Sequence, residues 1–174
     1  MTSFTKQSLR HATILSLLVF VCRSAQAQDE PVLTEGDRTP YVAIKTDRGT
    51  RITTAASGTG ILVVNFWETS CAPCVKELPS LSTFARRFRS ENVTVVAVSG
   101  DDDSSKYRRF LRDHHVTLET YRDPSRNISK RFGTFMFPET YVIQNGMIVR
   151  KVVGSIDWMS DDISSFVRTK LRQK

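Results

Sequence analysis

The sequence predicts an α/β fold in which a mixed central sheet is flanked by helices on both faces. Two apolar runs rich in β-branched residues, 61–67 and 93–99, are typical of buried strands, and an amphipathic segment follows each of them. Farther along, Asn145-Gly146 is a strong hairpin signal between two more strand-like runs, and a last amphipathic segment follows. Alternation of this kind is characteristic of layered α/β domains.

Two short strands are expected before the first buried strand. The run 41–45 alternates weakly between apolar and polar residues, 47–49 is a turn signal, and 50–53 can return as the second strand. Residues 55–60 are small and glycine-rich, which predicts a loop that leads into the sheet.

The first buried strand leads into two cysteines, Cys71 and Cys74, and then into a predicted helix. Pro73 fits the first turn of that helix, because the N–H that proline lacks would have no partner there. The apolar residues that recur at helical spacing are Val75, Leu78, Leu81, Phe84, Ala85 and Phe88. The two cysteines are therefore expected at the N-terminus of the helix.

The rest of the chain continues the alternation. The strand 93–99 follows this helix, so it should pair in parallel with the first buried strand through a right-handed crossover. The remaining predicted elements are a helix over 104–115, a strand over 116–121, a short helix over 126–132, strands over 140–143 and 147–153, and a helix from 160 to about 172.

The position of the cysteines predicts redox chemistry. A helix N-terminus offers the positive end of the helix dipole and unpaired N–H groups, which favour a thiolate over a thiol. A Cys-x-x-Cys pair between a strand and a helix is typical of a redox-active dithiol. The alternative is a structural disulfide, but a bridge between Cys71 and Cys74 would close almost no loop and would restrict the unfolded chain little.

The first 27 residues have the pattern of a secretory signal peptide. Lys6 and Arg10 precede an apolar run over 12–22, and residues 25–27 read Ala-Gln-Ala, a small-x-small cleavage site. The apolar run is too short to span a bilayer, so we expect cleavage after residue 27 rather than a membrane anchor.

Cleavage there would divide the chain into a signal at 1–27, a linker or flexible arm at 28–38 and one domain at 39–174. It would remove Cys22, which leaves Cys71 and Cys74 as the two cysteines of an exported, periplasmic protein. It would also remove three of the 25 basic residues and none of the 18 acidic ones, which lowers the net charge from +7 to +4. A charge of this size without a dense basic stripe gives nucleic-acid binding little support.

Three adjacent aspartates at 101–103 invite an interpretation as a metal site. They lack the spaced oxygen ligands of a calcium-binding loop. We expect instead a solvated loop whose negative charge suits the start of the following helix.

Two stretches resemble a known family. Residues 66–79, FWETSCAPCVKELP, resemble the exported TlpA/ResA/DsbE-like branch of the thioredoxin superfamily, which often reads FWATWC-PPC followed by Glu and Pro. Residues 133–140, GTFMFPET, and the YVIQNGMIV that follows are similar to the Pro-Glu-Thr segment of the same family. The resemblance covers roughly Thr39 to Leu171. It implies a thioredoxin-like fold and a thiol–disulfide oxidoreductase that needs no cofactor.

The resemblance implies a role for each site residue by its position in the motif. Cys71 would be the exposed nucleophile and Cys74 the more buried resolving thiol. Pro138 would be a cis proline beside the dithiol and would present the backbone of Phe137 to an extended target peptide. Glu77 would lie about one helical turn past Cys74 and move protons for that thiol.

Four positions leave alternatives open or depart from the family. Glu77 can also be explained as an exposed helix carboxylate near the positive end of the dipole. Asn65 replaces the buried aspartate of thioredoxin, so Glu77 is the better candidate for proton transfer. Ser70 replaces a tryptophan, which would open that side of the site. Trp67 is as consistent with core packing as with binding of the target.

We therefore expect a periplasmic oxidoreductase that exchanges disulfides with exported proteins, which include apocytochromes c. The Cys71 thiolate would attack a target disulfide, and Cys74 would resolve the mixed disulfide. The resemblance favours the reducing direction, with a membrane thiol as electron donor.

Three other functions are alternatives to this one. A dithiol oxidant would use the same residues in the opposite direction. A copper-binding chaperone would use the two cysteines with a third ligand such as His114 or His115. A peroxidase is disfavoured, because the apolar strand leads into a Cys-x-x-Cys pair and not into a lone peroxidatic cysteine with a nearby arginine.

Overall fold

The computed structural model describes residues 32–55 and 60–173. The expected signal peptide, the first part of the expected arm and most of the expected glycine-rich loop lie outside the described residues. Within the described ranges, no helix is both long enough and apolar enough to cross a membrane.

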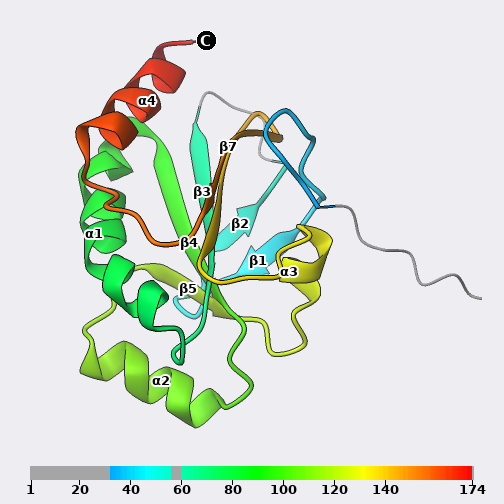
Figure 1. Ribbon diagram of the computed structural model, residues 1–174, viewed down its shortest axis with the longest axis vertical. Coiled ribbons are helices and arrows are strands. Elements are labelled where there is room, and N and C mark those ends of the chain that lie inside the picture. Colours follow the sequence, from blue (N-terminus) through cyan, green and yellow to red (C-terminus); the bar gives the residue numbers. More distant parts are fainter. Residues whose placement is uncertain (1–31, 56–59, 174) are drawn as a thin grey trace, which may run out of the picture.

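A five-stranded mixed sheet forms the centre of the domain, with strand order β5-β4-β3-β6-β7 (Figure 1). Its strands are β3 (Ile61–Trp67), β4 (Val93–Ser99), β5 (Glu119–Arg122), β6 (Glu139–Gln144) and β7 (Met147–Val153). β3 and β4 pair in parallel, as the predicted crossover requires, and β5 is parallel to β4. β6 is antiparallel to β3 and forms the predicted hairpin with β7. A separate hairpin joins β1 (Ala43–Lys45) and β2 (Arg51–Thr53).

Helices cover both faces of the sheet. They are α1 (Ala72–Phe88), the 3-10 turn η1 (Arg89–Glu91), α2 (Ser104–Asp113), α3 (Asn127–Arg131) and α4 (Asp161–Arg172). In Figure 1, α1 and α4 lie on one side of the sheet, and α3 and the β1–β2 hairpin lie on the other. The predicted α/β fold class, with its mixed sheet and helices on both faces, is confirmed.

The main difference in element bounds lies between α2 and β5. The helix ends at Asp113 and the strand begins only at Glu119, whereas the sequence predicted a helix to 115 and a strand from 116. His115 has a positive φ of 49°, and the N–H of Val116 bonds back to the carbonyl oxygen of Leu111 at 2.9 Å. This turn uses backbone groups that the apolar pattern had assigned to the strand.

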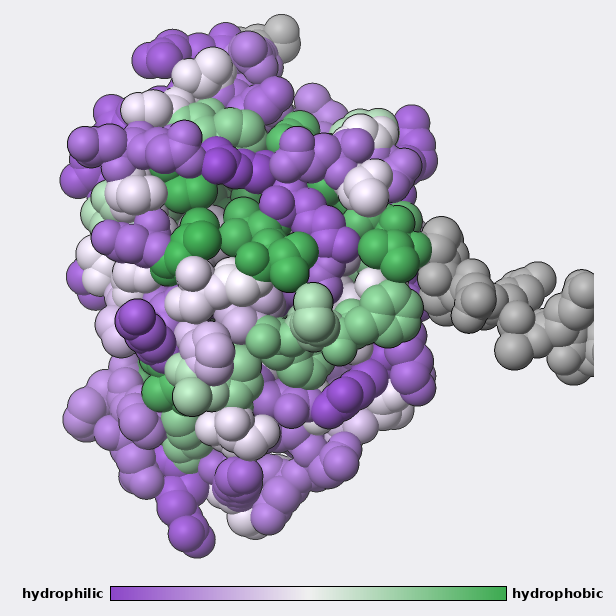
Figure 2. Space-filling view, viewed as in Figure 1, coloured by the Kyte–Doolittle hydropathy of each residue, from purple (hydrophilic) through white to green (hydrophobic). Residues whose placement is uncertain are grey.

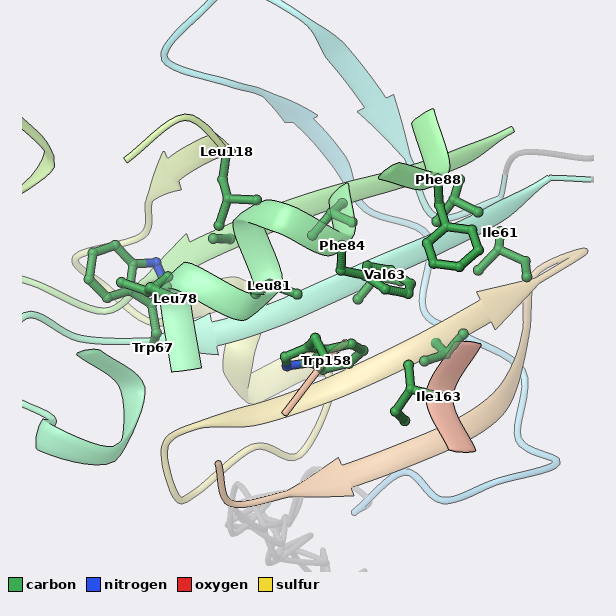
Figure 3. Close-up of a cluster of buried hydrophobic side chains, with 14 of the residues drawn as sticks. Ile61, Val63, Trp67, Leu78, Leu81, Phe84, Phe88, Leu118, Trp158 and Ile163 are labelled. Carbon is green, nitrogen blue, oxygen red and sulfur yellow. The ribbon is translucent and has the colours of Figure 1, made fainter. Parts of the chain in front are cut away.

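Two hydrophobic layers sandwich the sheet, because every side chain of β3 is buried and successive residues face opposite sides. The layer toward α1 and α4 includes Ile61, Val63, Trp67, Leu81, Phe84, Phe88, Trp158 and Ile163 (Figure 3). The layer toward α3 and the β1–β2 hairpin includes Ile44, Ile52, Leu62, Val64, Phe66, Phe132, Tyr141 and Ile143.

The described part of the expected arm, residues 32–38, lies along β7. The N–H of Gly36 donates to the carbonyl oxygen of Ile148, and the N–H of Ile148 donates to that of Asp37, both at 2.9 Å. The Leu33 side chain is buried in the layer that faces α3. These contacts hold this part of the segment against the domain.

Candidate redox site

A disulfide joins Cys71 and Cys74 at the start of α1. Cys71 is the N-cap residue, and its Sγ accepts a hydrogen bond from the backbone N–H of Cys74 at 3.2 Å. Cys71 is partly exposed, whereas Cys74 is completely buried. This difference in exposure suits an accessible attacking thiol at Cys71 and a shielded resolving thiol at Cys74. Pro73 lies in the first helical turn, as predicted.

The turn that delivers Cys71 to the helix is held by a buried carboxylate. Asp101 accepts hydrogen bonds from the backbone N–H of Thr69 at 3.0 Å and from its hydroxyl at 2.6 Å. Ser99, at the end of β4, donates its hydroxyl to the same carboxylate at 2.6 Å. The N–H of Cys71 then bonds to the carbonyl oxygen of Glu68 at 3.2 Å. The dithiol turn is thus fixed to the ends of β3 and β4.

The expectation of a solvated loop for the three aspartates is wrong for Asp101, which is only 8% exposed. Its burial follows from the contacts with Ser99 and Thr69. Asp103 behaves as expected: it is exposed and caps α2 by accepting hydrogen bonds from the N–H groups of Ser105 and Lys106. Those two bonds hold the pKa of Asp103 below its usual range.

The peptide bond between Phe137 and Pro138 is cis, as the resemblance implied. Phe66 near the end of β3 pairs with Glu139 at the start of β6, so Pro138 lies at the same end of the sheet as the dithiol turn. Pro138 is buried and Phe137 partly exposed. The two preceding side chains, Phe135 and Met136, are 73% and 65% exposed.

Glu77 is buried on α1, one helical turn past Cys74, with an exposed fraction of 2%. Its carboxylate accepts hydrogen bonds from Asn65 Nδ2 at 2.8 Å, and from the backbone N–H of Ile156 and from Trp158 Nε1 at 3.4 Å each. Burial raises the pKa of Glu77, and the three hydrogen bonds only partly oppose that rise. The alternative of an exposed helix carboxylate is therefore wrong.

The donors around Glu77 come from two separate parts of the chain, β3 and the loop between β7 and α4. Asn65 on β3 donates to Thr140 Oγ1 as well as to Glu77, both at 2.8 Å. In the sequence, Asn65 indicates only the loss of a proton acceptor, and no local pattern there points to Thr140, Ile156 or Trp158 as its neighbours at this site. Trp158 offered a signal as one of two tryptophans in the chain, but it lies in a loop whose burial the apolar pattern does not predict.

Trp67 belongs to the core and is 0% exposed, so of the two explanations considered for it, core packing is correct and substrate binding is wrong. Its ring packs against two side chains of α2, with ring centroids 6.2 Å from Tyr107 and 5.4 Å from Phe110. As the last residue of β3, Trp67 faces the layer between the sheet and the helices. No part of its side chain is open to a target protein.

The two histidines considered as copper ligands lie at the C-terminal end of α2. The ring of His114 stacks on Phe110 with centroids 4.1 Å apart, and His115 is exposed in the following turn. Across residues 32–55 and 60–173, no group of three or more His, Cys, Asp or Glu side chains is arranged to hold a metal ion.

Comparison with known proteins agrees with this geometry. The model of the AhpC/TSA family matches residues 36–152. The chain is 27% identical over 148 residues to the thiol-disulfide oxidoreductase ResA of Bacillus subtilis, covering 80% of this chain and 82% of that protein. It is 26% identical over 149 residues to ResA of Oceanobacillus iheyensis, covering 82% of this chain and 77% of that protein.

Solved structures share the fold at lower sequence identity. A Chlorobium tepidum protein assigned as thiol:disulfide interchange protein DsbE superposes with a TM-score of 0.71 at 21% identity, covering 80% of this chain and 99% of that one. StoA of Bacillus subtilis superposes with a TM-score of 0.64 at 20% identity, covering 79% of this chain and 98% of that one.

Proposed function

This chain belongs to the AhpC/TSA family, and from that premise we propose that it is an exported thiol–disulfide oxidoreductase that reduces disulfides in other exported proteins. Thiol–disulfide exchange itself is supported both by the ResA and DsbE relatives and by the Cys71–Cys74 disulfide. The reducing direction, the export and the identity of the substrates are the parts that we add.

The observation that carries the proposal is a partly exposed cysteine bridged to a buried one at a helix N-terminus. In the reduced protein, the dipole and the N–H of Cys74 stabilise a thiolate on Cys71, which attacks a substrate disulfide. One substrate sulfur leaves as a thiolate, and Cys71 becomes part of a mixed disulfide. The Cys74 thiolate then attacks Cys71, releases the second substrate thiolate and forms the Cys71–Cys74 bridge.

Exposed apolar side chains beside the site support a protein substrate. Phe135 and Met136 project into solvent immediately before Phe137 and the cis proline. In the view of Figure 2, apolar residues also gather in a band across the middle of the molecule, between hydrophilic regions above and below. Exposed apolar surface of this kind commonly marks a binding site, and an unfolded substrate offers apolar segments to cover it.

The reducing direction is supported by the carboxylate behind Cys74. A strong oxidant of this type stabilises its reduced form by favouring the thiolate. When it is ionised, Glu77 works against a thiolate at the dithiol, because a buried negative charge about one turn from Cys74 disfavours a second one nearby. The reduced form is then less stabilised relative to the disulfide, which is the property of a reductant.

Glu77 is also proposed to accept the Cys74 proton during resolution. Burial raises the pKa of Glu77, so it holds a proton more readily than an ordinary glutamate, as a proton acceptor must. The electron donor would be a membrane thiol protein, and apocytochromes c are among the substrates that would fit.

A trapping experiment tests the exchange function, and a redox titration tests its direction. In cells that make Cys74→Ser, the substrate should remain bound to Cys71 as a mixed disulfide, which can be isolated and identified; Cys71→Ser serves as control. A potential toward about −270 mV supports a reductant, whereas a value near about −120 mV would identify an oxidant. A normally expressed Cys74→Ser protein that traps nothing would contradict the proposal.

A further inference from the structure

A charged and aromatic cluster links the segment before Cys71 to the segment before Pro138. It consists of Glu68, Arg126 and Phe137, and we call it the Arg126 cluster. Arg126 Nη2 forms an ion pair with Glu68 Oε1. The guanidinium carbon of Arg126 also lies 5.4 Å from the centroid of the Phe137 ring, within the range of a cation–π contact.

The cluster closes over Gly100, at the end of β4. A Cβ atom at this position would lie 2.7 Å from Glu68 Oε1 and 3.3 Å from both Arg126 Nε and Phe137 Cε2. The Glu68 carboxylate would have to move to make room for a Cβ atom, and the other two contacts would be tight. Glycine at position 100 thus leaves room for the three side chains to meet.

The backbone also holds Arg126 in place. Arg126 has a positive φ of 54°, a conformation that residues other than glycine and asparagine adopt rarely and that often marks a functional position. Its N–H bonds to the carbonyl oxygen of Asp123 at 2.9 Å, and the N–H of Asp123 bonds to that of Ser99 at 2.7 Å. The Asp123 carboxylate accepts the N–H of Ile128 at 2.7 Å. The turn is thus anchored to the end of β4.

Both ends of the cluster are bonded directly to residues of the redox site. The carbonyl oxygen of Glu68 accepts the hydrogen bond of the Cys71 N–H at 3.2 Å, so Glu68 is part of the turn that carries the attacking sulfur. Phe137 is joined to Pro138 by the cis peptide bond. The family pattern has alanine where this chain has Glu68, so the ion pair distinguishes this chain from that pattern.

We propose that Arg126 is a positioning residue for protein substrates. By holding Glu68 and Phe137 together, it fixes the spacing between Cys71 and the backbone edge at Phe137 on which an extended substrate chain would lie. The inference rests on the proposed function. The Arg126 side chain is 50% exposed, and ion pairs of such exposure stabilise a fold little, so the contribution lies in geometry.

The test compares enzyme kinetics of variants with insulin as the protein disulfide. Arg126→Met keeps the length of the side chain but loses the charge, and Glu68→Ala restores the residue of the family pattern. Both should raise KM for insulin about tenfold with kcat changed less than about twofold, because a backbone edge that is held loosely must first be ordered when the substrate chain binds to it. Arg126→Lys, which retains the ion pair, should give an intermediate KM. Gly100→Ala should also raise KM, because the added methyl group would crowd the side chains of the Arg126 cluster.

Arg150 provides a matched control on β7. It pairs with Asp162 at 2.7 Å and lies 4.9 Å from the Phe166 ring, the same kind of contact at a place outside the dithiol and cis-proline segments. Arg150→Met should keep the wild-type KM. The inference is overturned if Arg126→Met has the wild-type KM, or if both arginine variants raise it equally. A wild-type protein that leaves insulin disulfides intact would instead overturn the proposed function itself.

Discussion

Two buried glutamates lie on opposite faces of the central sheet, and their surroundings differ in one respect. Glu77, on α1, is 2% exposed and accepts hydrogen bonds from neutral donors. Glu139, on β6, is 4% exposed and lies 2.5 Å from the ammonium group of Lys151. Among the described residues, no lysine, arginine or histidine pairs with Glu77.

Glu139 lies among a charged partner and a hydrogen-bond donor. Lys151 pairs with the carboxylate, and the hydroxyl of Tyr141 donates to it at 2.8 Å. Lys151 is itself held by the carbonyl oxygen of Leu33 at 2.9 Å. Burial, together with the acceptor Glu139, raises the pKa of Tyr141, so the hydroxyl stays protonated as a donor. This carboxylate is part of a closed structural network.

The surroundings of Glu77 leave its charge free to change. With no cation beside it, only hydrogen bonds from neutral donors offset the desolvation of the ionised carboxylate, and burial raises its pKa for that reason. A paired carboxylate therefore stabilises the fold, whereas an unpaired one can exchange a proton. The contrast teaches that burial alone does not separate the structural carboxylate from the one that we propose to exchange protons; the presence or absence of a partner charge does.

The largest expected effect concerns the paired carboxylate. Glu139→Gln would leave the Lys151 ammonium, whose side chain is only 14% exposed, without its ion-pair partner, and removing one member of such a pair costs about 3 kcal/mol of unfolding free energy. Urea unfolding at neutral pH measures the loss. The double variant Glu139→Gln, Lys151→Met removes the orphaned charge and should recover part of it. Equal stability of wild type and Glu139→Gln would remove the basis of the comparison.

A somewhat smaller effect is expected at the unpaired carboxylate, and it appears in rate. Glu77→Gln keeps the shape of the side chain but cannot accept the Cys74 proton, so exchange should slow about 100-fold, as is common when a general base is lost. The rate of insulin reduction at neutral pH measures this, and Glu139→Gln, corrected for its folded fraction, is the matched control. If both variants slow exchange equally, the two carboxylates do not differ in function.

The pH dependence of stability should also separate wild type from Glu77→Gln. Because burial raises the pKa of Glu77 above its ordinary 4.5, the folded protein binds this proton more tightly than the unfolded chain does. The unfolding free energy of wild type relative to Glu77→Gln should therefore fall as the pH rises above 4.5, by at most about 1.4 kcal/mol per pH unit. Denaturation of the oxidised proteins at several pH values measures it, and a difference that grows with pH would contradict the assignment.

The smallest expected effect concerns Asn65, which links Glu77 to β6. The hydrogen bond from Asn65 lowers the pKa of Glu77. In Asn65→Leu, the pH dependence of the rate of insulin reduction should therefore shift toward higher pH. The cost in unfolding free energy should be about 1 kcal/mol, the net value of a typical hydrogen bond. A profile that stays in place in Asn65→Leu would mean that another group sets it.

The strands of this fold could be predicted from the sequence where a single local pattern dominates. The runs 61–67, 93–99 and 147–153 match β3, β4 and β7 residue for residue, because each run is rich in β-branched residues and ends at clear turn signals. The start of β5 could not be predicted, since the turn after α2 depends on His115 in a left-handed conformation.

The candidate site was predictable only in part for the same reason. The two cysteines and the cis proline come from contiguous motifs. The helical spacing of Cys74, Glu77, Leu81 and Phe84 also contained a signal that Glu77 faces the core, although its charge argued for the surface. The partners of Glu77 and the pairing of Glu68 with Arg126 join residues far apart in sequence, and no local pattern predicts such contacts.

The hydrogen bond from the Trp158 indole to Glu77 has a consequence for observing the enzyme at work. Indole fluorescence responds to a charge beside the ring, so the emission of Trp158 should report the protonation state of Glu77 without any added label. The chain has one other tryptophan, Trp67, which can be replaced by phenylalanine to leave Trp158 as the single emitter. The protein thus carries its own optical probe next to the proton acceptor that we propose.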